Sequence, residues 1–188
     1  MNLEFFPSIE IIMGPVQCGK TTELLQRLLT HHLMGRKVLY INSVLDTRST
    51  EFFSTHNLSI GNVPFKGVKL DKLSGYDVNE YDVIGIDECQ FFDDLKVNVL
   101  EWVESCGKMV LVSGLDGDYK RENFGHISEL LSYCDMVTKL KAFCMLCRKK
   151  GVSGFGIFSK RLVENSSSVL IGGEEMYLPV CRRCYVSP

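Results

Sequence analysis

Long apolar runs are absent from this sequence of 188 residues. No stretch reaches the roughly 18 consecutive apolar residues that a membrane-spanning helix requires. The first residues, Met1 to Glu4, also lack the basic-then-apolar order of a secretory signal. We therefore expect a soluble, cytoplasmic protein with no membrane partner.

An excess of charge of one sign is absent as well. Lys and Arg number 21 and Asp and Glu number 23, so the formal net charge is −2. A protein that binds nucleic acid non-specifically needs a positive surface to neutralise phosphates, so no nucleic-acid partner is expected. With 45% apolar and 23% charged residues, the chain has the composition of an ordinary globular protein. Its length fits one domain with a small appendage.

Short apolar runs and helical patterns alternate along most of the chain. Because this alternation is typical of βαβ units, we predict an α/β fold with a parallel sheet flanked by helices. Residues 43–76 carry little periodicity and are expected to form loops with short strands. The alternation stops after Lys141, which divides the chain into an α/β domain of residues 1–141 and a subdomain of residues 142–188. The predicted strands are residues 8–13, 37–42, 81–87 and 109–114, and the predicted helices are residues 21–34 and 92–105.

A phosphate-binding motif lies between the first predicted strand and the first predicted helix. Its eight residues fit the pattern G-x-x-x-x-G-K-[ST]. In this pattern the loop N–H groups and the helix N-terminus attract phosphate, the lysine reaches the β- and γ-phosphates, and the hydroxyl binds Mg²⁺. A chance glycine-rich turn would rarely have a strand and a helix on the correct sides, so we predict a site for ATP with Mg²⁺. The residues are Gly14, Pro15, Val16, Gln17, Cys18, Gly19, Lys20 and Thr21.

Two adjacent carboxylates, Asp87 and Glu88, end the third predicted strand. In a parallel sheet this edge lies beside the phosphate loop, so Asp87 is predicted to hold Mg²⁺ together with Thr21. Successive side chains of a strand point to opposite faces, so Glu88 can face an acceptor and take its hydroxyl proton or orient a water. Two acids after a strand can also be a solvated turn, an interpretation that the neighbouring phosphate loop disfavours.

Cysteine pairs mark the C-terminal subdomain. Without a secretory signal, eight cysteines favour thiols and metal over disulfides. Two pairs have C-x₂-C spacing, Cys144 with Cys147 and Cys181 with Cys184, and together they predict a closed tetrahedral site for structural Zn²⁺. Buried free cysteines or a redox pair are the alternatives. The 33 residues between the pairs, 148–180, exceed the usual spacing and should form a loop or hairpin that the metal fixes at its base.

The remaining cysteines are expected to be buried or half-buried apolar residues, with one exception. Cys18 lies in the phosphate loop at a helix N-terminus, a setting that can lower the pKa of a thiol. We therefore expect Cys18 to be sensitive to oxidation. The residues expected to pack in or near the core are Cys89, Cys106 and Cys134.

Further motifs follow one another in a fixed order along nearly the whole chain. They are Gly14–Thr21, Asp46-Thr47-Arg48, Thr55-His56, Asp87-Glu88-Cys89-Gln90-Phe91-Phe92, Gly114-Leu115-Asp116-Gly117-Asp118-Tyr119, Arg121 with Phe124-Gly125, Ser159-Lys160-Arg161, Ile171-Gly172-Gly173, and Tyr177 before the second cysteine pair. In this order and spacing the chain resembles the zinc-containing, cytosolic-type thymidine kinases. The resemblance implies a P-loop (RecA-like) parallel sheet with a small zinc-binding lasso subdomain. It further implies transfer of the ATP γ-phosphate to the 5′-hydroxyl of thymidine, a homotetramer, and feedback inhibition by dTTP.

The resemblance also implies a role for each matching residue. Glu88 matches the catalytic base of the family. Asp46, Thr47, Arg48 and Gln90 match positions that line the ATP and phosphate region. In the family, the lasso between the cysteine pairs closes over the base and binds it largely through backbone groups. The residues that match nucleoside-binding positions are Val16, Phe91, Leu115, Tyr119, Phe124, Ser159, Ser168, Val169, Leu170, Ile171, Gly172 and Tyr177.

Three departures from the usual family pattern leave every catalytic group in place. Val16-Gln17-Cys18 stands where Met-Phe-Ser is usual, Asn57 replaces an aspartate, and Cys89 replaces a small residue. The first of these is expected to change the nucleoside pocket and the range of nucleosides that it accepts.

Two other functions stay open from the residues alone. One is a nucleic-acid-stimulated ATPase, because Asp87 to Gln90 also resembles the acidic box of helicase-type motors. The other is a zinc-ribbon binding module in which the nucleotide only regulates. The chain length disfavours the motor, which generally needs two RecA-like domains.

Overall fold

The computed structural model describes residues 6–46, 63–162 and 176–187. At its centre lies a six-stranded sheet in the order β3-β2-β4-β5-β1-β6, and its five strand pairs are parallel. Strand β1 lies between β5 and β6, so the chain that leaves β1 for the phosphate loop does so from inside the sheet. The strands are β1 (Ser8–Met13), β2 (Val38–Ser43), β3 (Lys66–Leu70), β4 (Val83–Ile86), β5 (Met109–Gly114) and β6 (Met136–Lys139).

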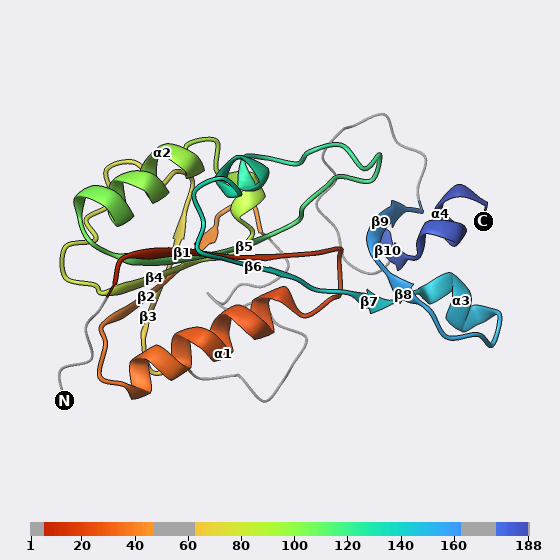
Figure 1. Cartoon of the computed structure of the whole chain (residues 1–188), viewed down its shortest axis with the longest axis horizontal. Coiled ribbons are helices and arrows are strands. Elements are labelled where there is room, and N and C mark those ends of the chain that lie inside the picture. The colour runs from red at the N-terminus through yellow and green to blue at the C-terminus, as the bar shows by residue number, and fades with distance from the viewer. Residues whose placement is uncertain (1–5, 47–62, 163–175, 188) are drawn as a thin grey trace.

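Helices cover both faces of this sheet (Figure 1). Helix α1 (Lys20–Leu33) lies on one face, and α2 (Leu95–Leu100), continued by the π-helical segment η3 (Glu101–Ser105), lies on the other. Because the side chains of a strand alternate between faces, Ile11 packs with the α2 residues and Ile12 with the α1 leucines. The short 3₁₀ segments are η2 (Cys89–Phe91) and η4 (Ile127–Leu130).

The parallel α/β fold predicted from the sequence is confirmed, but two details differ. The predicted helix 92–105 is wrong at its start, because Phe92 has an extended backbone (φ −101°, ψ 108°) and α2 begins at Leu95. Strand β6 was not predicted. Its residues Met136 and Val137 are 44% and 45% exposed, so this edge strand lacks the buried apolar run that marks the inner strands.

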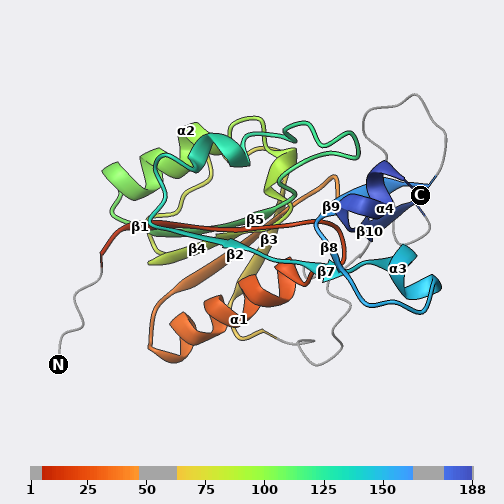
Figure 2. The same cartoon turned by 45° about the vertical axis from the view of Figure 1, so that its right-hand side comes forward.

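The cysteine pairs lie in a small C-terminal lobe, a name used here for residues 142–162 and 176–187. The lobe has two small antiparallel sheets, one of β9 and β10 and one of β7 and β8, with two short helices. Figures 1 and 2 both show it beyond the end of the sheet where β1 passes to α1. Its elements are β7 (Ala142–Phe143), α3 (Met145–Lys149), β8 (Phe155–Gly156), β9 (Phe158–Arg161), β10 (Tyr177–Val180) and α4 (Arg182–Val186).

Two further expectations concern the domain boundary and membrane-spanning helices. The division of the chain after Lys141 stays a prediction. In the described ranges, no helix combines the length and the apolar character that crossing a bilayer would take.

Candidate active site and metal centre

The phosphate loop joins β1 to α1 at the carboxyl end of the sheet. Gln17 and Gly19 have left-handed backbones, with φ of 59° and 87°. Backbones of this kind turn successive N–H groups toward one side and form anion-binding concavities. Lys20 is only 8% exposed, and its ammonium donates to the carbonyl of Pro15 at 2.9 Å within the same loop. The loop therefore has left-handed residues of the kind found in anion-binding loops, and phosphate binding by Lys20 stays a prediction.

The low thiol pKa expected for Cys18 is wrong. Burial raises the pKa of this thiol, and the effect outweighs the lowering influence of the Lys20 ammonium, which lies 3.9 Å from the sulfur. A thiol with a raised pKa holds little of the reactive thiolate at neutral pH. The sequence identified the helix N-terminus beside Cys18 but gave no measure of how far the thiol is covered. Cys106 is exposed, which also contradicts the expectation that it packs in or near the core.

Asp87 is held by several hydrogen-bond donors at the end of β4. The Ser113 hydroxyl donates to its Oδ1 at 2.7 Å, the Glu88 backbone N–H donates to the same oxygen at 3.0 Å, and the Tyr40 hydroxyl donates to Oδ2 at 3.0 Å. Burial and the neighbouring charge of Glu88 raise the pKa of Asp87, against the opposing effect of a hydrogen bond with Thr21. The hydroxyl and carboxylate predicted to hold Mg²⁺ thus lie together, and oxygen ligands of this kind suit the ion.

Glu88 has a fixed orientation beside Asp87. It is 8% exposed, and its backbone is left-handed with φ of 46°. For a residue with a side chain, such a backbone costs about 1 to 3 kcal/mol and persists only where the surroundings hold it. A carboxylate oxygen of Glu88 accepts a hydrogen bond from the side-chain amide nitrogen of Gln90 at 2.6 Å, and the side-chain amide oxygen of Gln90 accepts one from the Leu115 backbone N–H at 3.0 Å. The end of β5 therefore fixes the direction of the predicted base.

Predicted nucleoside-binding side chains lie around Gln90 and Leu115, the residues that orient Glu88. The rings of Phe91 and Phe124 meet edge to face, with centroids 5.9 Å apart. Leu115 is tied to the same place by its hydrogen bond to Gln90. The structure thus brings Phe91, Leu115 and Phe124 together near Glu88.

The C-terminal lobe reaches the phosphate loop through Ser159 of β9. The Ser159 hydroxyl accepts a hydrogen bond from the Val16 backbone N–H at 3.1 Å, and Ser159 is 5% exposed. Both residues were predicted to contact the nucleoside, and they are 143 positions apart in the chain. Their contact joins the two parts of the predicted site.

Other predicted residues are only partly described. Asp46 is buried after β2, where Asn42 donates to its carboxylate at 3.0 Å and Lys69 donates to its carbonyl at 2.9 Å. The neighbours of Asp46 that are predicted to line the ATP and phosphate region, and the central lasso residues, lie outside the described residues. Their roles stay predictions. These residues are Thr47, Arg48, Ser168, Val169, Leu170, Ile171 and Gly172.

The four predicted zinc ligands lie together in the lobe. The sulfur atoms of Cys144, Cys147, Cys181 and Cys184 are all within 4.8 Å of one another. The Cys147 sulfur is 3.8 Å from that of Cys181 and 3.6 Å from that of Cys184. Four sulfurs bound tetrahedrally at about 2.3 Å from Zn²⁺ would be about 3.8 Å apart. The residues present therefore fit a closed structural zinc site.

Each cysteine pair also forms the same local turn. The Cys147 backbone N–H donates to the Cys144 sulfur, and the Cys184 backbone N–H donates to the Cys181 sulfur, both at 3.4 Å. A sulfur that accepts such a bond is stabilised as the thiolate that binds metal.

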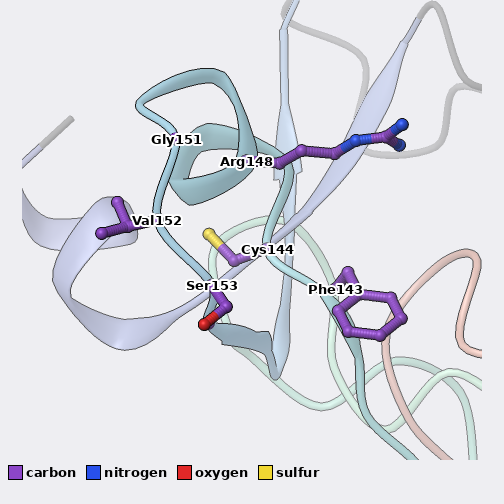
Figure 3. Close-up of a pocket in the computed structure, with 7 residues that line it drawn as sticks. Phe143, Cys144, Arg148, Gly151, Val152 and Ser153 are labelled. Carbon is purple, nitrogen blue, oxygen red and sulfur yellow. The ribbon is translucent and has the colours of Figure 1, made fainter.

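A hollow of about 490 Å³ lies in the C-terminal lobe beside Cys144 (Figure 3). Phe143, Arg148 and Val152 are among its lining side chains. None of the residues that line it is a carboxylate or a histidine, and the phosphate loop contributes nothing to it. This hollow therefore shares no residue with the phosphate loop or with the Asp87–Glu88 pair.

Sequence reasoning missed the side chains that hold Asp87. Tyr40 lies in β2 and Ser113 in β5, the strands that pair with β4 on its two sides. Neither residue belongs to a recognisable motif. Only the strand order brings their hydroxyls to one carboxylate, so no signal in the sequence could have found them.

A strand–loop–helix phosphate site, an oriented carboxylate beside it and a lobe with four clustered cysteines define a P-loop phosphotransferase with a metal-binding lobe. The model of the thymidine kinase family matches residues 7–185. The chain belongs to this family and is a kinase, which confirms the resemblance seen in the motifs.

Proteins named thymidine kinase are similar along almost the whole chain. One from Raccoon poxvirus is 39% identical over 181 residues, which cover 95% of this chain and 97% of the viral protein. One from Vaccinia virus (strain Ankara) is 38% identical over 180 residues, with 95% and 96% covered. One from Oryza sativa subsp. japonica is 39% identical over 183 residues, which cover 95% of this chain and 66% of the plant protein.

Proposed function

We propose that this protein phosphorylates thymidine with ATP as the phosphate donor. The observation that carries the proposal is the buried Glu88 carboxylate, which Gln90 orients at the carboxyl end of the sheet beside the phosphate loop. The 5′-hydroxyl oxygen of the nucleoside attacks the γ-phosphorus, Glu88 accepts the hydroxyl proton, and ADP leaves. Phosphoryl transfer depends mainly on positioning and charge neutralisation, so one carboxylate at the acceptor is sufficient.

The phosphate loop binds the donor in this proposal. Its N–H groups and the Lys20 ammonium hold the β- and γ-phosphates. Thr21 and Asp87 are the residues that would hold Mg²⁺, an ion that would supply positive charge to neutralise the phosphate oxygens. Tyr40 and Ser113 keep the Asp87 carboxylate in one orientation.

The C-terminal lobe binds the acceptor. In this proposal the lasso between the cysteine pairs closes over the base, and the four thiolates would hold structural Zn²⁺, which would fix the two ends of the lasso. The hydrogen bond between Ser159 and Val16 supports this arrangement, because it ties β9 to the phosphate loop. A closed lasso keeps water from the γ-phosphate. From the family resemblance we also expect a homotetramer and inhibition by dTTP.

The test is a nucleoside panel with ATP and Mg²⁺. Monophosphate formation is followed from thymidine, deoxyuridine, deoxycytidine and deoxyadenosine. Thymidine should be phosphorylated, and Glu88→Gln should lower kcat about 10²- to 10⁴-fold because the general base is lost. Glu104→Gln is the matched control, since Glu104 is exposed and lies in η3, on the face of the sheet that α2 covers.

ATP binding, and ATP hydrolysis with and without added nucleic acid, are measured beside the panel, and three outcomes would differ from the proposal. ATP hydrolysis that nucleic acid stimulates, without nucleoside product, would establish the ATPase. ATP binding without turnover on any nucleoside would establish the binding module. A rate with deoxyuridine equal to that with thymidine would show that the pocket beside Val16 does not recognise the thymine methyl group.

A further inference from the structure

Two arginines and two tyrosines join the C-terminal lobe to the loop between β5 and η4. Tyr119 and Arg121 belong to the loop, Arg161 to β9 and Tyr185 to α4. Each side places an arginine on the tyrosine of the other. The Arg161 guanidinium carbon lies 3.8 Å from the ring centroid of Tyr119, and that of Arg121 lies 4.4 Å from the ring centroid of Tyr185. These four residues are named here the Arg–Tyr bridge, and Figures 1 and 2 show the loop extending toward the lobe.

Hydrogen bonds fix the bridge more closely than stacking alone. The Tyr185 hydroxyl donates to the backbone carbonyl of Tyr119 at 2.8 Å. Nη2 of Arg161 donates to the hydroxyl of Tyr177 at 2.8 Å. A single guanidinium thus touches both tyrosines that are predicted to bind the nucleoside, Tyr119 through its plane and Tyr177 through an N–H group. A lysine has no such plane and could not make both contacts in this way.

The loop is shaped to present its half of the bridge. The Asp118 carboxylate accepts hydrogen bonds from the backbone N–H groups of Lys120 and Glu122 at 2.8 and 2.9 Å, which closes a tight turn. Arg121 lies within the turn and has a left-handed backbone with φ of 71°. A long side chain keeps such a conformation only where surrounding contacts hold it. The guanidinium of Arg121 has these contacts on Tyr185 and, at 5.5 Å, on Phe158.

We propose that Arg161 and Tyr185 are positioning residues through which the C-terminal lobe holds Tyr119 and Tyr177 in place for the nucleoside. This inference rests on the proposed function and adds a role that neither motif nor metal chemistry predicts. None of the bridge contacts involves Glu88, Asp87 or Lys20. The bridge should therefore set the KM for thymidine and leave the KM for ATP and the transfer step unchanged.

The test compares three variants by steady-state kinetics. Arg161→Met keeps the aliphatic stem but loses the charge and the plane, and should raise the KM for thymidine about tenfold with kcat within about twofold of wild type. Arg161→Lys should not restore the wild-type KM, because it returns the charge without the plane. Tyr185→Phe removes only the hydroxyl and should raise the KM about threefold.

The controls separate positioning from general stability. Arg182→Met makes the same change in the same lobe, but Arg182 lies on Phe158, 5.0 Å from the ring centroid, and its KM should equal that of wild type. Zinc content and melting temperature should be the same in all four proteins. In a Tyr119→Leu background, Arg161→Met should add little to the KM, because the ring that it holds is gone.

Two sets of results would overturn the inference. If wild type phosphorylates thymidine and the KM of Arg161→Met is unchanged, or rises only together with loss of zinc or a matching fall in melting temperature, the bridge is a structural contact alone. If wild type phosphorylates no nucleoside, the proposed function fails and the inference fails with it.

Discussion

Among the described residues, twenty buried side chains pack on the α2 side of the sheet and eight on the α1 side. The buried core of the C-terminal lobe has four, and two of these are the cysteines Cys144 and Cys184. A sheet with so much buried apolar surface is stabilised mainly by the hydrophobic effect. A core of four residues cannot supply comparable stability, so we expect the lobe to depend on a metal at its four cysteines and on polar and cationic contacts.

The difference in packing between the sheet and the lobe matches the two parts of the proposed reaction, phosphate transfer and nucleoside selection. The groups that need fixed positions, Lys20, Asp87 and Glu88, lie at the end of the well-packed sheet. The groups that select the nucleoside include Ser159 and Tyr177 in the lobe. Changes to Asp87 or Glu88 should therefore act mainly on kcat, and changes to the nucleoside-binding residues of the lobe should act mainly on the KM for thymidine.

The largest expected effect comes from removing the metal. Structural zinc contributes about 10 kcal/mol or more to the folding of small domains. Chelation, or Cys147→Ser, should unfold the lobe while the sheet stays folded. Limited proteolysis should then cut the chain after about residue 141, and thymidine phosphorylation should be lost although ATP still binds.

Cys106→Ser is the matched control for this prediction, because Cys106 is exposed and outside the metal cluster. It should keep its zinc and resist the protease like wild type. A lobe that still resists the protease after chelation would have enough stability without metal. It would contradict the inference that the lobe, unlike the sheet, depends on zinc to stay folded.

The sequence was most informative where neighbouring residues carry the signal. The phosphate loop from Gly14 to Thr21, and the two cysteine pairs, are recognised from spacing over a few residues, and the structure has left-handed residues in that loop and the sulfur cluster that the pairs predict. Strands with continuous apolar runs were found for the same reason.

What the sequence could not show depends on strand order or on burial. Tyr40 meets Asp87 only because β2 pairs with β4, and Tyr185 meets Tyr119 across 66 positions of sequence. The raised thiol pKa of Cys18 follows from burial, which no local pattern reports. Strand β6 was not predicted because an exposed edge strand has few of the buried apolar residues by which strands are recognised in a sequence.

A second prediction compares alanine substitutions at two glycines, Gly125 beside Gln90 and Gly75 away from other atoms. Gly125 has φ of 65°, and a Cβ there would lie 2.5 Å from the backbone oxygen of Gln90. Gly75 has φ of 83° with nothing within 4 Å of a Cβ. Gly75→Ala should cost about 1 kcal/mol of unfolding free energy for the left-handed backbone alone. Gly125→Ala should cost about 3 kcal/mol, since Gln90 must also move.

The effect of Gly125→Ala on catalysis gives the sharper result. Moving Gln90 releases the Glu88 carboxylate, so kcat for thymidine should fall while Gly75→Ala keeps the wild-type value. Urea denaturation and steady-state kinetics measure the two quantities. Equal costs for the two variants would show that Gln90 does not move, whereas a cost of about 3 kcal/mol with an unchanged kcat would show that Gln90 does not orient the base.

The smallest effect concerns Asp94, a carboxylate that is not one of the predicted site residues. Asp94 accepts hydrogen bonds from the Ser74 hydroxyl and backbone N–H at 2.7 Å and from the Leu73 N–H at 3.0 Å. Burial raises the pKa of Asp94, but these hydrogen bonds outweigh burial and lower it below its ordinary value. A lowered carboxyl pKa stabilises the folded state above the unfolded pKa of about 3.9, and the contribution is lost as pH falls through the folded pKa. Asp94→Asn should therefore cost about 1 kcal/mol or less at pH 7, a difference that shrinks below about pH 4.

The exposed neighbour Asp93 provides the control, because Asp93→Asn should leave the free energy of unfolding at pH 7 unchanged. Denaturation of the three proteins between pH 3 and pH 7 measures the effect. Because Asp94 joins the residues before β4 to the start of α2, its loss should change neither zinc content nor the KM for thymidine. A change in zinc content would mean that the sheet and the lobe are coupled in stability, and the separate roles inferred for them would then have to be joined.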